Sequence, residues 1–193
     1  MADQTTRPET RRAYHGSCHC GHTRYIAYLT LPTSSIKPSK HPASTTRIYK
    51  CNCSTCRKMG LFHVRPIDPP TDFQLLSPLN PTSGGLSDYQ CFAKVNHWYF
   101  CPKCGVRCFS LIGEGEVRTE DVEGEKKREV WGFKRKEWDE ADKKYLSVNA
   151  LTLEPDQEGL DLREWVEKGW IAYLDHSGKE ESNMGQPHAG DPY

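Results

Sequence analysis

Seven of the nine cysteines in this chain of 193 residues fall into three tight groups, and this grouping constrains the fold more than any other feature. The groups are CHC at 18–20, CNCSTC at 51–56 and CPKC at 101–104. Zinc binds thiolate sulfur in a tetrahedral shell, and a C-x-x-C turn directs two sulfurs at one point. The spacing therefore predicts metal binding.

The N-terminal sequence bears on the redox state of these cysteines. MADQTTRPETRR has no apolar core, so it is not typical of a secretory signal. We expect a cytoplasmic protein, with a nuclear location as the alternative. Thiols stay reduced in both compartments, which favours metal ligation or thiol chemistry over disulfides.

The first and the last group together supply the four ligands of one tetrahedral site. We call Cys18, Cys20, Cys101 and Cys104 the four-cysteine group and predict that it holds a structural zinc. Such a site contributes to the free energy of folding. The alternatives are free buried cysteines or a redox-active C-x-x-C pair. A redox pair does not come with a partnering C-x-C, and no βαβ pattern surrounds this one.

The middle group supplies three sulfurs rather than four. We call Cys51, Cys53 and Cys56 the three-cysteine group. A zinc with three protein ligands keeps an open position, as catalytic sites do, and three thiolates form a soft site suited to a thiol substrate. The alternative is a second structural zinc with a fourth protein ligand.

The candidates for that fourth ligand are Cys91, Cys108 and His63. Both cysteines lie in apolar, strand-like segments, so we interpret them as buried cysteines without a ligand role.

Strand patterns dominate the rest of the chain. The segment 22–31 alternates so that Tyr25, Ala27 and Leu29 share one face. Further strands are expected at 89–93, 98–100, 107–112, 130–133, 146–153 and 170–174. The proline-rich stretch 66–85 is expected to be irregular or to carry short edge strands, and the charged stretch 113–129 to be a solvated excursion.

One helix is expected, over 161–168. Asp161 resembles an N-cap, Leu162, Trp165 and Val166 have the spacing of one helix face, and Gly169 suits the C-terminal end.

Together these patterns predict a mainly β fold of small antiparallel sheets with one or two short helices. The domain is expected to span 14–176, between a disordered arm at 1–13 and a disordered tail at 177–193.

Charge and hydropathy exclude several classes of partner. Lys and Arg number 26, as do Asp and Glu, so the basic excess of a nucleic-acid-binding protein is absent. No run of 18 apolar residues occurs, so we expect no membrane partner. The expected partner is a small-molecule thiol or thiol adduct. The sequence does not predict the oligomeric state.

Four motifs resemble those of a known family. They are GSCHCG at 16–21, CNCSTCRKMG at 51–60, NHWYFCPKCGVRCF at 96–109 and YLSVNALTL at 145–153. In this order they resemble the glutathione-dependent formaldehyde-activating enzymes and their relatives grouped with centromere protein V. The resemblance implies an Mss-four-like zinc fold with two zinc ions, a structural one in the four-cysteine group and a catalytic one in the three-cysteine group.

The resemblance also implies an activity. The expected function is a zinc-dependent carbon–sulfur lyase that forms or cleaves S-hydroxymethylglutathione or cleaves another conjugate, with glutathione as a candidate co-substrate. The alternative is a zinc-stabilised protein-interaction module without catalysis, a class in which an open three-ligand site has little use.

Residues near the cysteines are assigned roles on this hypothesis. His97 and His63 are the candidate proton shuttles; the alternatives are a structural role for His97 and an exposed surface position for His63. Arg57, Lys58 and Arg65 are candidates to bind a carboxylate of the substrate, with a solvated charged face as the alternative.

Overall fold

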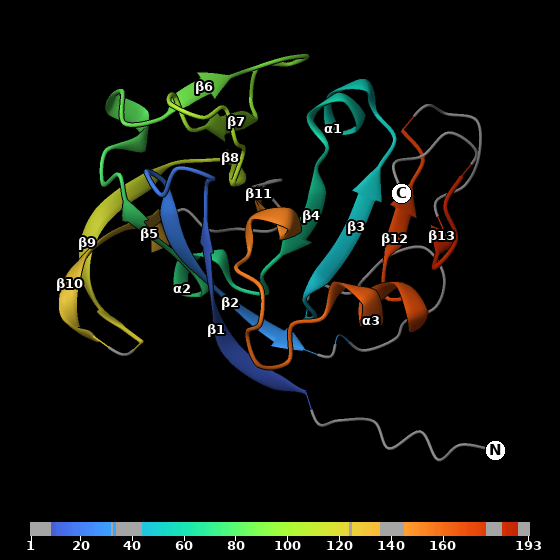
Figure 1. Cartoon of the computed structure of the whole chain (residues 1–193). Helices are drawn as coiled ribbons and strands as arrows, with labels where there is room; N and C mark the ends of the chain where they lie inside the picture. The colour runs from blue at the N-terminus through green and yellow to red at the C-terminus, as the bar shows by residue number, and fades with distance from the viewer. Residues whose placement is uncertain are drawn as a thin grey trace.

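The computed structural model describes residues 9–31, 33, 44–123, 125–135, 145–176 and 183–188. These residues form a five-stranded sheet, an eight-stranded sheet and short helices between the strands (Figure 1). The prediction of a mainly β fold is confirmed. The described residues contain three short α-helices where one or two were expected. The rest of the expected arm and tail, residues 1–8, 177–182 and 189–193, lies outside the described residues.

The five-stranded sheet has the order β1–β2–β5–β10–β9, with all its pairings antiparallel. The strands are β1 (Thr10–Ser17), β2 (Arg24–Leu31), β5 (Phe73–Ser77), β9 (Gly115–Val122) and β10 (Glu125–Phe133). The predicted alternation of β2 is confirmed, because Tyr25, Ala27 and Leu29 all lie in the main core.

Three sequence expectations for this sheet are wrong. Strand β1 starts at Thr10, inside the expected arm, because its pairing with β2 runs from Thr10 to Ser17 and buries Tyr14 completely. Strand β5 is an internal strand between β2 and β10, although its proline-rich surroundings predicted an edge.

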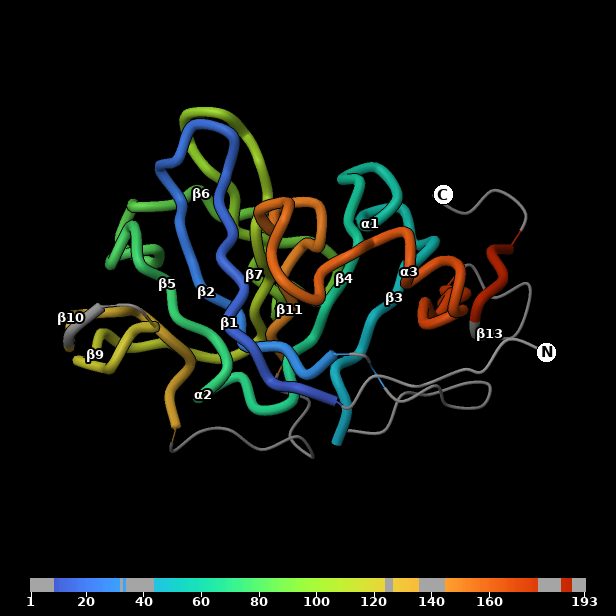
Figure 2. Tube along the Cα trace, turned by 60° about the horizontal axis from the view of Figure 1, so that its bottom comes forward, coloured from blue at the N-terminus to red at the C-terminus, as the bar shows by residue number. Residues whose placement is uncertain are grey.

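The third wrong expectation concerns 113–129, which was expected to be a solvated excursion. This segment instead contains β9 and the start of β10, which form a hairpin at the sheet edge (Figure 2). Its charged residues pair with each other on one face: Arg118 Nε donates to Glu120 Oε1 at 2.7 Å. Val122, Val130 and Trp131 supply buried apolar side chains. A high charge content therefore hid a strand that uses ion pairs on one face.

The eight-stranded sheet has the order β13–β12–β3–β4–β11–β8–β7–β6. Its strands are β3 (Arg47–Cys51), β4 (Phe62–Arg65), β6 (Ser87–Tyr89), β7 (His97–Phe100), β8 (Phe109–Ile112), β11 (Tyr145–Asn149), β12 (Ala172–Leu174) and β13 (Asn183–Met184). Strand β12 pairs with β3 in parallel, and the other pairings are antiparallel. Strand β13 corrects the expected tail, because Asn183 and Met184 pair with β12.

The strand expected at 89–93 is also shortened. Strand β6 ends at Tyr89, and the chain then turns, with Lys94 N donating to Cys91 O at 3.0 Å. Phe92 and Lys94 have φ values of 52° and 54°, which an extended strand does not contain.

The helices are short, and the first and third have a side-chain N-cap. They are α1 (Ser54–Met59), α2 (Pro69–Asp72) and α3 (Leu162–Glu167), with 3-10 turns at Pro81–Ser83 and Ala150–Thr152. In α3 the predicted cap is confirmed, since Asp161 Oδ1 accepts from Arg163 N at 2.9 Å. The expected common face is wrong in one residue: Trp165 is fully buried, but Val166 is 59% exposed.

The main hydrophobic core contains residues of both sheets and of α3, including Tyr25, Phe73, Phe109, Trp131 and Trp165. A smaller cluster contains Cys51, Cys56, Leu61 and Trp98 beside α1. Among the residues that the structure describes, no helix is long and apolar enough to cross a membrane.

Gly16 gives a test of packing in the first hairpin. A Cβ at this position would lie 2.2 Å from Tyr25 Cζ, and the Tyr25 hydroxyl is held at 2.8 Å by Thr152 Oγ1. We expect Gly16→Ala to lower the free energy of unfolding by about 2–3 kcal/mol. Thermal unfolding should show a Tm about 4–12 °C lower.

Gly84→Ala is the matched control. Gly84 has φ +95° and nothing within 4 Å of an added Cβ, so only backbone strain is introduced there. A Gly16→Ala loss no larger than the Gly84→Ala loss would contradict the proposed clash.

Candidate metal centres and pocket

The four-cysteine group is assembled from two segments that are far apart in sequence. Its sulfur atoms lie within 4.8 Å of one another. Cys20 Sγ is 3.7 Å from Cys18 Sγ and 3.6 Å from Cys101 Sγ, across 81 residues of sequence. Four sulfurs around a zinc at about 2.3 Å would be separated by about 3.8 Å. The group therefore has the ligand number and spacing of a metal site.

Backbone turns set this geometry. Thr23 N donates to Cys18 Sγ at 3.2 Å, and Gly105 N donates to Cys101 O at 2.9 Å. Gly105 has φ +75°, which turns the chain back after the C-x-x-C pair.

The thiols of this group do not titrate alike. Burial alone would raise the pKa of Cys18, but hydrogen bonds from Thr23 and from neighbouring thiols bring it down to about 6. Burial raises the pKa of Cys101 to about 11. Cys18 therefore ionises more readily than Cys101. A cation bound by all four sulfurs would stabilise their thiolate forms together.

The three-cysteine group forms where β3 passes into α1. Cys51 ends β3, Cys53 is the N-cap of α1 and Cys56 lies in its first turns. The three sulfurs lie within 4.8 Å of one another. Cys53 N donates to Cys51 Sγ, and Cys56 N donates to Cys53 Sγ, each at 3.4 Å. Helix α1 ends at Gly60, whose φ of +61° suits only glycine well.

The pKa values in this group separate strongly. A hydrogen bond from Cys56 is the main cause that lowers the pKa of Cys51 to about 6. The same bond, followed by burial, raises the pKa of Cys56 far above its usual value. Without a cation, Cys56 therefore keeps its proton and donates it in a hydrogen bond that stabilises the thiolate of Cys51.

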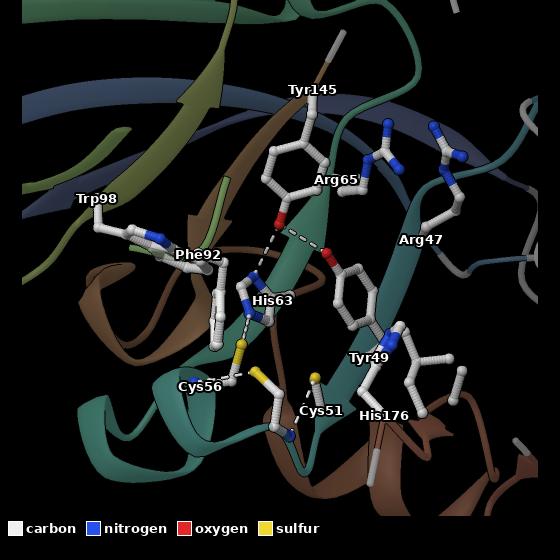
Figure 3. Close-up of a pocket in the computed structure, with 13 residues that line it drawn as sticks. Arg47, Tyr49, Cys51, Cys56, His63, Arg65, Phe92, Trp98, Tyr145 and His176 are labelled. Carbon is white, nitrogen blue, oxygen red and sulfur yellow. Dashed lines mark hydrogen bonds between the residues drawn. The ribbon is translucent and has the colours of Figure 1, made fainter. Parts of the chain in front are cut away.

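A pocket of about 750 Å³ opens on the three-cysteine group (Figure 3). Residues from β3, β4, β7, β11 and β12, from α1 and from the turn after β6 line it. They are Arg47, Tyr49, Cys51, Cys53, Cys56, His63, Arg65, Phe92, Trp98, Tyr145, Ala172, Leu174 and His176. Cross-strand pairing places Arg47 opposite Arg65 and Tyr49 opposite His63.

His63 is the histidine that contacts the cysteines. It is only 3% exposed, which corrects the alternative of a surface position. Its Nε2 is 3.2 Å from Cys56 Sγ, and its Nδ1 is 3.0 Å from Ser147 Oγ and 3.1 Å from the Tyr145 hydroxyl. Burial, assisted by the nearby charge of Arg65, lowers the pKa of His63 to about 3, so the imidazole is neutral.

Two tyrosines extend this hydrogen-bonded chain, and the sequence analysis missed both. The Tyr145 and Tyr49 hydroxyl oxygens are 2.6 Å apart, and the Tyr49 ring stacks on His63 with centroids 4.6 Å apart. Burial raises the pKa of both hydroxyls, which keeps them protonated. The period-two spacing of Arg47, Tyr49 and Cys51 is the sequence signal that could have placed Tyr49 on the pocket face.

His97, the predicted shuttle, lies elsewhere. Its Nδ1 is 2.7 Å from Asp88 Oδ2, and its ring stacks on Tyr99. Because side chains alternate along β7, Trp98 rather than His97 lines the pocket. The structure therefore does not bring His97 to the pocket with the three-cysteine group.

Arg57 and Lys58 are also not brought to the pocket. Both are exposed on α1, and Lys58 lines a separate, smaller pocket of about 280 Å³. Arg47 and Arg65 line the main pocket instead. Helix α1 turns the two residues after Cys56 outward, which the spacing within CNCSTCRKMG did not indicate.

The three candidates for a fourth ligand, Cys91, Cys108 and His63, also lie in different places. Cys91 Sγ contacts Thr55 Oγ1 at 3.4 Å. Cys108 is buried in the main core, where burial and the charge of Cys18 raise its pKa. Of the three candidates, His63 is the one in contact with the three-cysteine group.

No family model and no curated protein matches the chain. Among solved structures, a structural-genomics crystal structure of a Rhodobacter sphaeroides protein is 17% identical with a TM-score of 0.43. The match covers 83% of this chain and 99% of that chain. A similarity at this level carries no argument about function.

Proposed function

We propose that the protein is a zinc-dependent carbon–sulfur lyase that acts on thiol adducts. The observation that carries the proposal is the three-cysteine group, whose sulfurs lie within 4.8 Å of one another. It faces a pocket of about 750 Å³ and lies beside the buried, neutral His63. The sequence motifs support the same activity, and S-hydroxymethylglutathione is the first adduct to test.

The donor set fits zinc. Three closely spaced thiols are soft ligands, and their mutual repulsion on ionisation calls for a cation. Cys51, Cys53 and Cys56 would hold it. A zinc ion held there would stabilise the thiolate form of a substrate thiol, which would make its sulfur a good nucleophile and leaving group.

His63 is suited to proton transfer. Cleavage of an S-hydroxymethyl adduct removes the hydroxyl proton, forms the carbonyl double bond and leaves the electron pair of the carbon–sulfur bond on sulfur. A neutral imidazole can accept the hydroxyl proton and return it to sulfur. Ser147 and Tyr145 contact Nδ1 and orient the ring so that Nε2 faces the thiols.

Apolar groups complete the environment. Trp98 and Leu174 line the pocket, and the Trp98 ring lies edge-on to His63 with centroids 6.1 Å apart. These side chains exclude water from the reacting carbon, which strengthens electrostatic interactions there.

His63→Gln tests the proton transfer. We expect kcat for adduct cleavage to fall by about 10²–10⁴-fold, because general acid–base catalysis contributes that much. The zinc content should remain two per chain, since His63 is not a metal ligand on this proposal. Steady-state kinetics and elemental analysis of the same preparation measure both quantities.

His97→Gln is the control, because His97 pairs with Asp88 away from the pocket. Its kcat should match that of the wild type. A His97→Gln variant as impaired as His63→Gln would contradict the assigned role of His63.

A non-catalytic zinc module is the second candidate. The 3.2 Å contact between His63 Nε2 and Cys56 Sγ favours it, because a small shift would make His63 the fourth ligand of a closed site. In that case His63→Gln would lower the zinc content, and no thiol would enter the metal's ligand shell.

The direct test is turnover by the zinc-loaded full chain. Formaldehyde adducts of glutathione and of simple thiols are supplied, and proton NMR follows their cleavage. We expect cleavage that stops on chelation and a zinc-edge absorption spectrum that changes when thiol is added. No turnover together with an unchanged spectrum would overturn the lyase proposal in favour of the zinc module.

A further inference from the structure

The pocket has a second end that the proposed chemistry does not use. Along β3, Cys51, Tyr49 and Arg47 follow each other at every second position and all line the pocket. Four residue steps of about 3.3 Å separate the backbone at Cys51 from that at Arg47 by about 13 Å. Figure 3 shows the side chains of Arg47 and Arg65 away from the cysteines.

Among the residues that the structure describes, Arg65 is a cation without an acidic partner. It takes part in none of the ion pairs between described residues. Its Nε is buried and has no hydrogen-bond partner among them. Its guanidinium lies over the Tyr145 ring, 4.6 Å from the centroid, which fixes the side chain beside the pocket. A buried, unsatisfied Nε–H is costly unless a ligand accepts from it.

Cross-strand pairing doubles the charge at this end. Arg47 on β3 lies directly opposite Arg65 on β4, and both line the pocket. The positive potential of two guanidinium groups on one face attracts an anion to this end of the pocket. A guanidinium fork matches a carboxylate in two parallel hydrogen bonds.

The middle of the pocket sets the character of the ligand between its ends. Tyr49 lies between Cys51 and Arg47 along β3, and Ala172 of β12 lies opposite Tyr49. Trp98 and Leu174 add apolar walls next to the cysteines, and the Tyr49 hydroxyl is already used by Tyr145. These walls favour a hydrocarbon or aromatic body and offer few partners for peptide groups.

We propose that Arg65 and Arg47 bind the carboxylate of a substrate whose sulfur reaches the three-cysteine group and whose body is apolar. This rests on the proposed function for the sulfur end but not for the carboxylate end. The substrate class is an elongated mercaptocarboxylic acid or its adduct, which we expect to bind more tightly than glutathione.

Calorimetric titration of the zinc-loaded full chain tests the proposal with two matched pairs of probes. Mercaptohexanoate is compared with mercaptohexanol, and hexanoate with hexanol. We expect the acid of each pair to bind at least tenfold more tightly than the alcohol, and Arg65→Gln to remove that preference while leaving alcohol binding unchanged. Arg65→Lys keeps the charge but loses the fork, so it should retain part of the preference.

Arg57→Gln is the control, because Arg57 is exposed on α1 and does not line the pocket. It should retain the full preference. Circular dichroism of each variant confirms that the fold is intact.

The outcomes separate the two proposals. If hexanoate binding depends on Arg65 but the thiols bind no more tightly than their sulfur-free counterparts, carboxylate binding is supported. The proposed binding of a thiol at the three-cysteine group is then contradicted. If mercaptohexanol binds well but neither acid is preferred, or if Arg65→Gln retains the preference, the carboxylate end is overturned. Tighter binding of glutathione than of mercaptohexanoate would contradict the apolar body.

Discussion

Cys20→Ser is expected to lower the Tm by about 8–16 °C and to release one of two zinc ions. Structural zinc sites contribute about 10–16 kcal/mol in small domains that are unfolded without the metal. This chain has a large hydrophobic core of its own, so we expect loss of the zinc to cost about a third of that, about 4 kcal/mol. For a chain of this length, each kcal/mol corresponds to about 2–4 °C. Cys20 is exposed, so its replacement removes little packing and reports on the metal.

Cys91→Ser is the matched control. Cys91 belongs to neither cysteine group and is more buried than Cys20, so a packing loss alone would affect it more. We expect its Tm to stay within about 2 °C of the wild type. Chelation of the wild type should lower its Tm to about that of Cys20→Ser. A Cys20→Ser variant with full zinc content and an unchanged Tm would show that the four-cysteine group is not a structural metal site.

Cys53→Ser is expected to have the largest effect on activity. The variant should lose the second zinc, and adduct cleavage should fall by at least about 10³-fold, because the chemistry depends on the metal. Its Tm should change by less than about 2 °C. Serine is a preferred N-cap residue, so its hydroxyl can accept from Cys56 N as the Cys53 sulfur does.

Ser54→Ala tests whether disturbance of α1 alone explains such a loss. Ser54 is the exposed first residue of the helix and contributes no ligand to the group. Its zinc content and rate should match the wild type. Full lyase activity in a Cys53→Ser preparation that holds one zinc would separate catalysis from the three-cysteine group.

The two cysteine groups were predictable because their spacing encodes their geometry. A C-x-C or C-x-x-C segment fixes two sulfurs locally, and combining the segments leaves few arrangements. The residues around them were not predictable in the same way. His63 and Tyr145 are separated by 82 residues and meet only because β4 pairs with β11.

Two kinds of sequence signal did not indicate where the residues lie in the structure. His97 has the residue type of a shuttle and lies in a matching motif, but strand alternation turns it toward Asp88. The high charge content of the β9–β10 hairpin predicts a solvent-exposed loop. The segment forms strands nevertheless, because Arg118 and Glu120 pair with each other on one face. Composition alone does not distinguish a charged loop from a strand with paired charges.

The parallel pairing of β12 with β3 implies that the pocket forms late in folding. Leu174 lies opposite Cys51, 123 positions later in the chain, and its strand supplies one wall. Contacts between such distant positions form late, because closing a long loop is entropically costly. During synthesis the thiols of Cys51, Cys53 and Cys56 therefore emerge long before they are enclosed. If these thiols bind zinc as proposed, early metal loading would protect them from oxidation, and zinc supply during translation would affect the yield of intact protein.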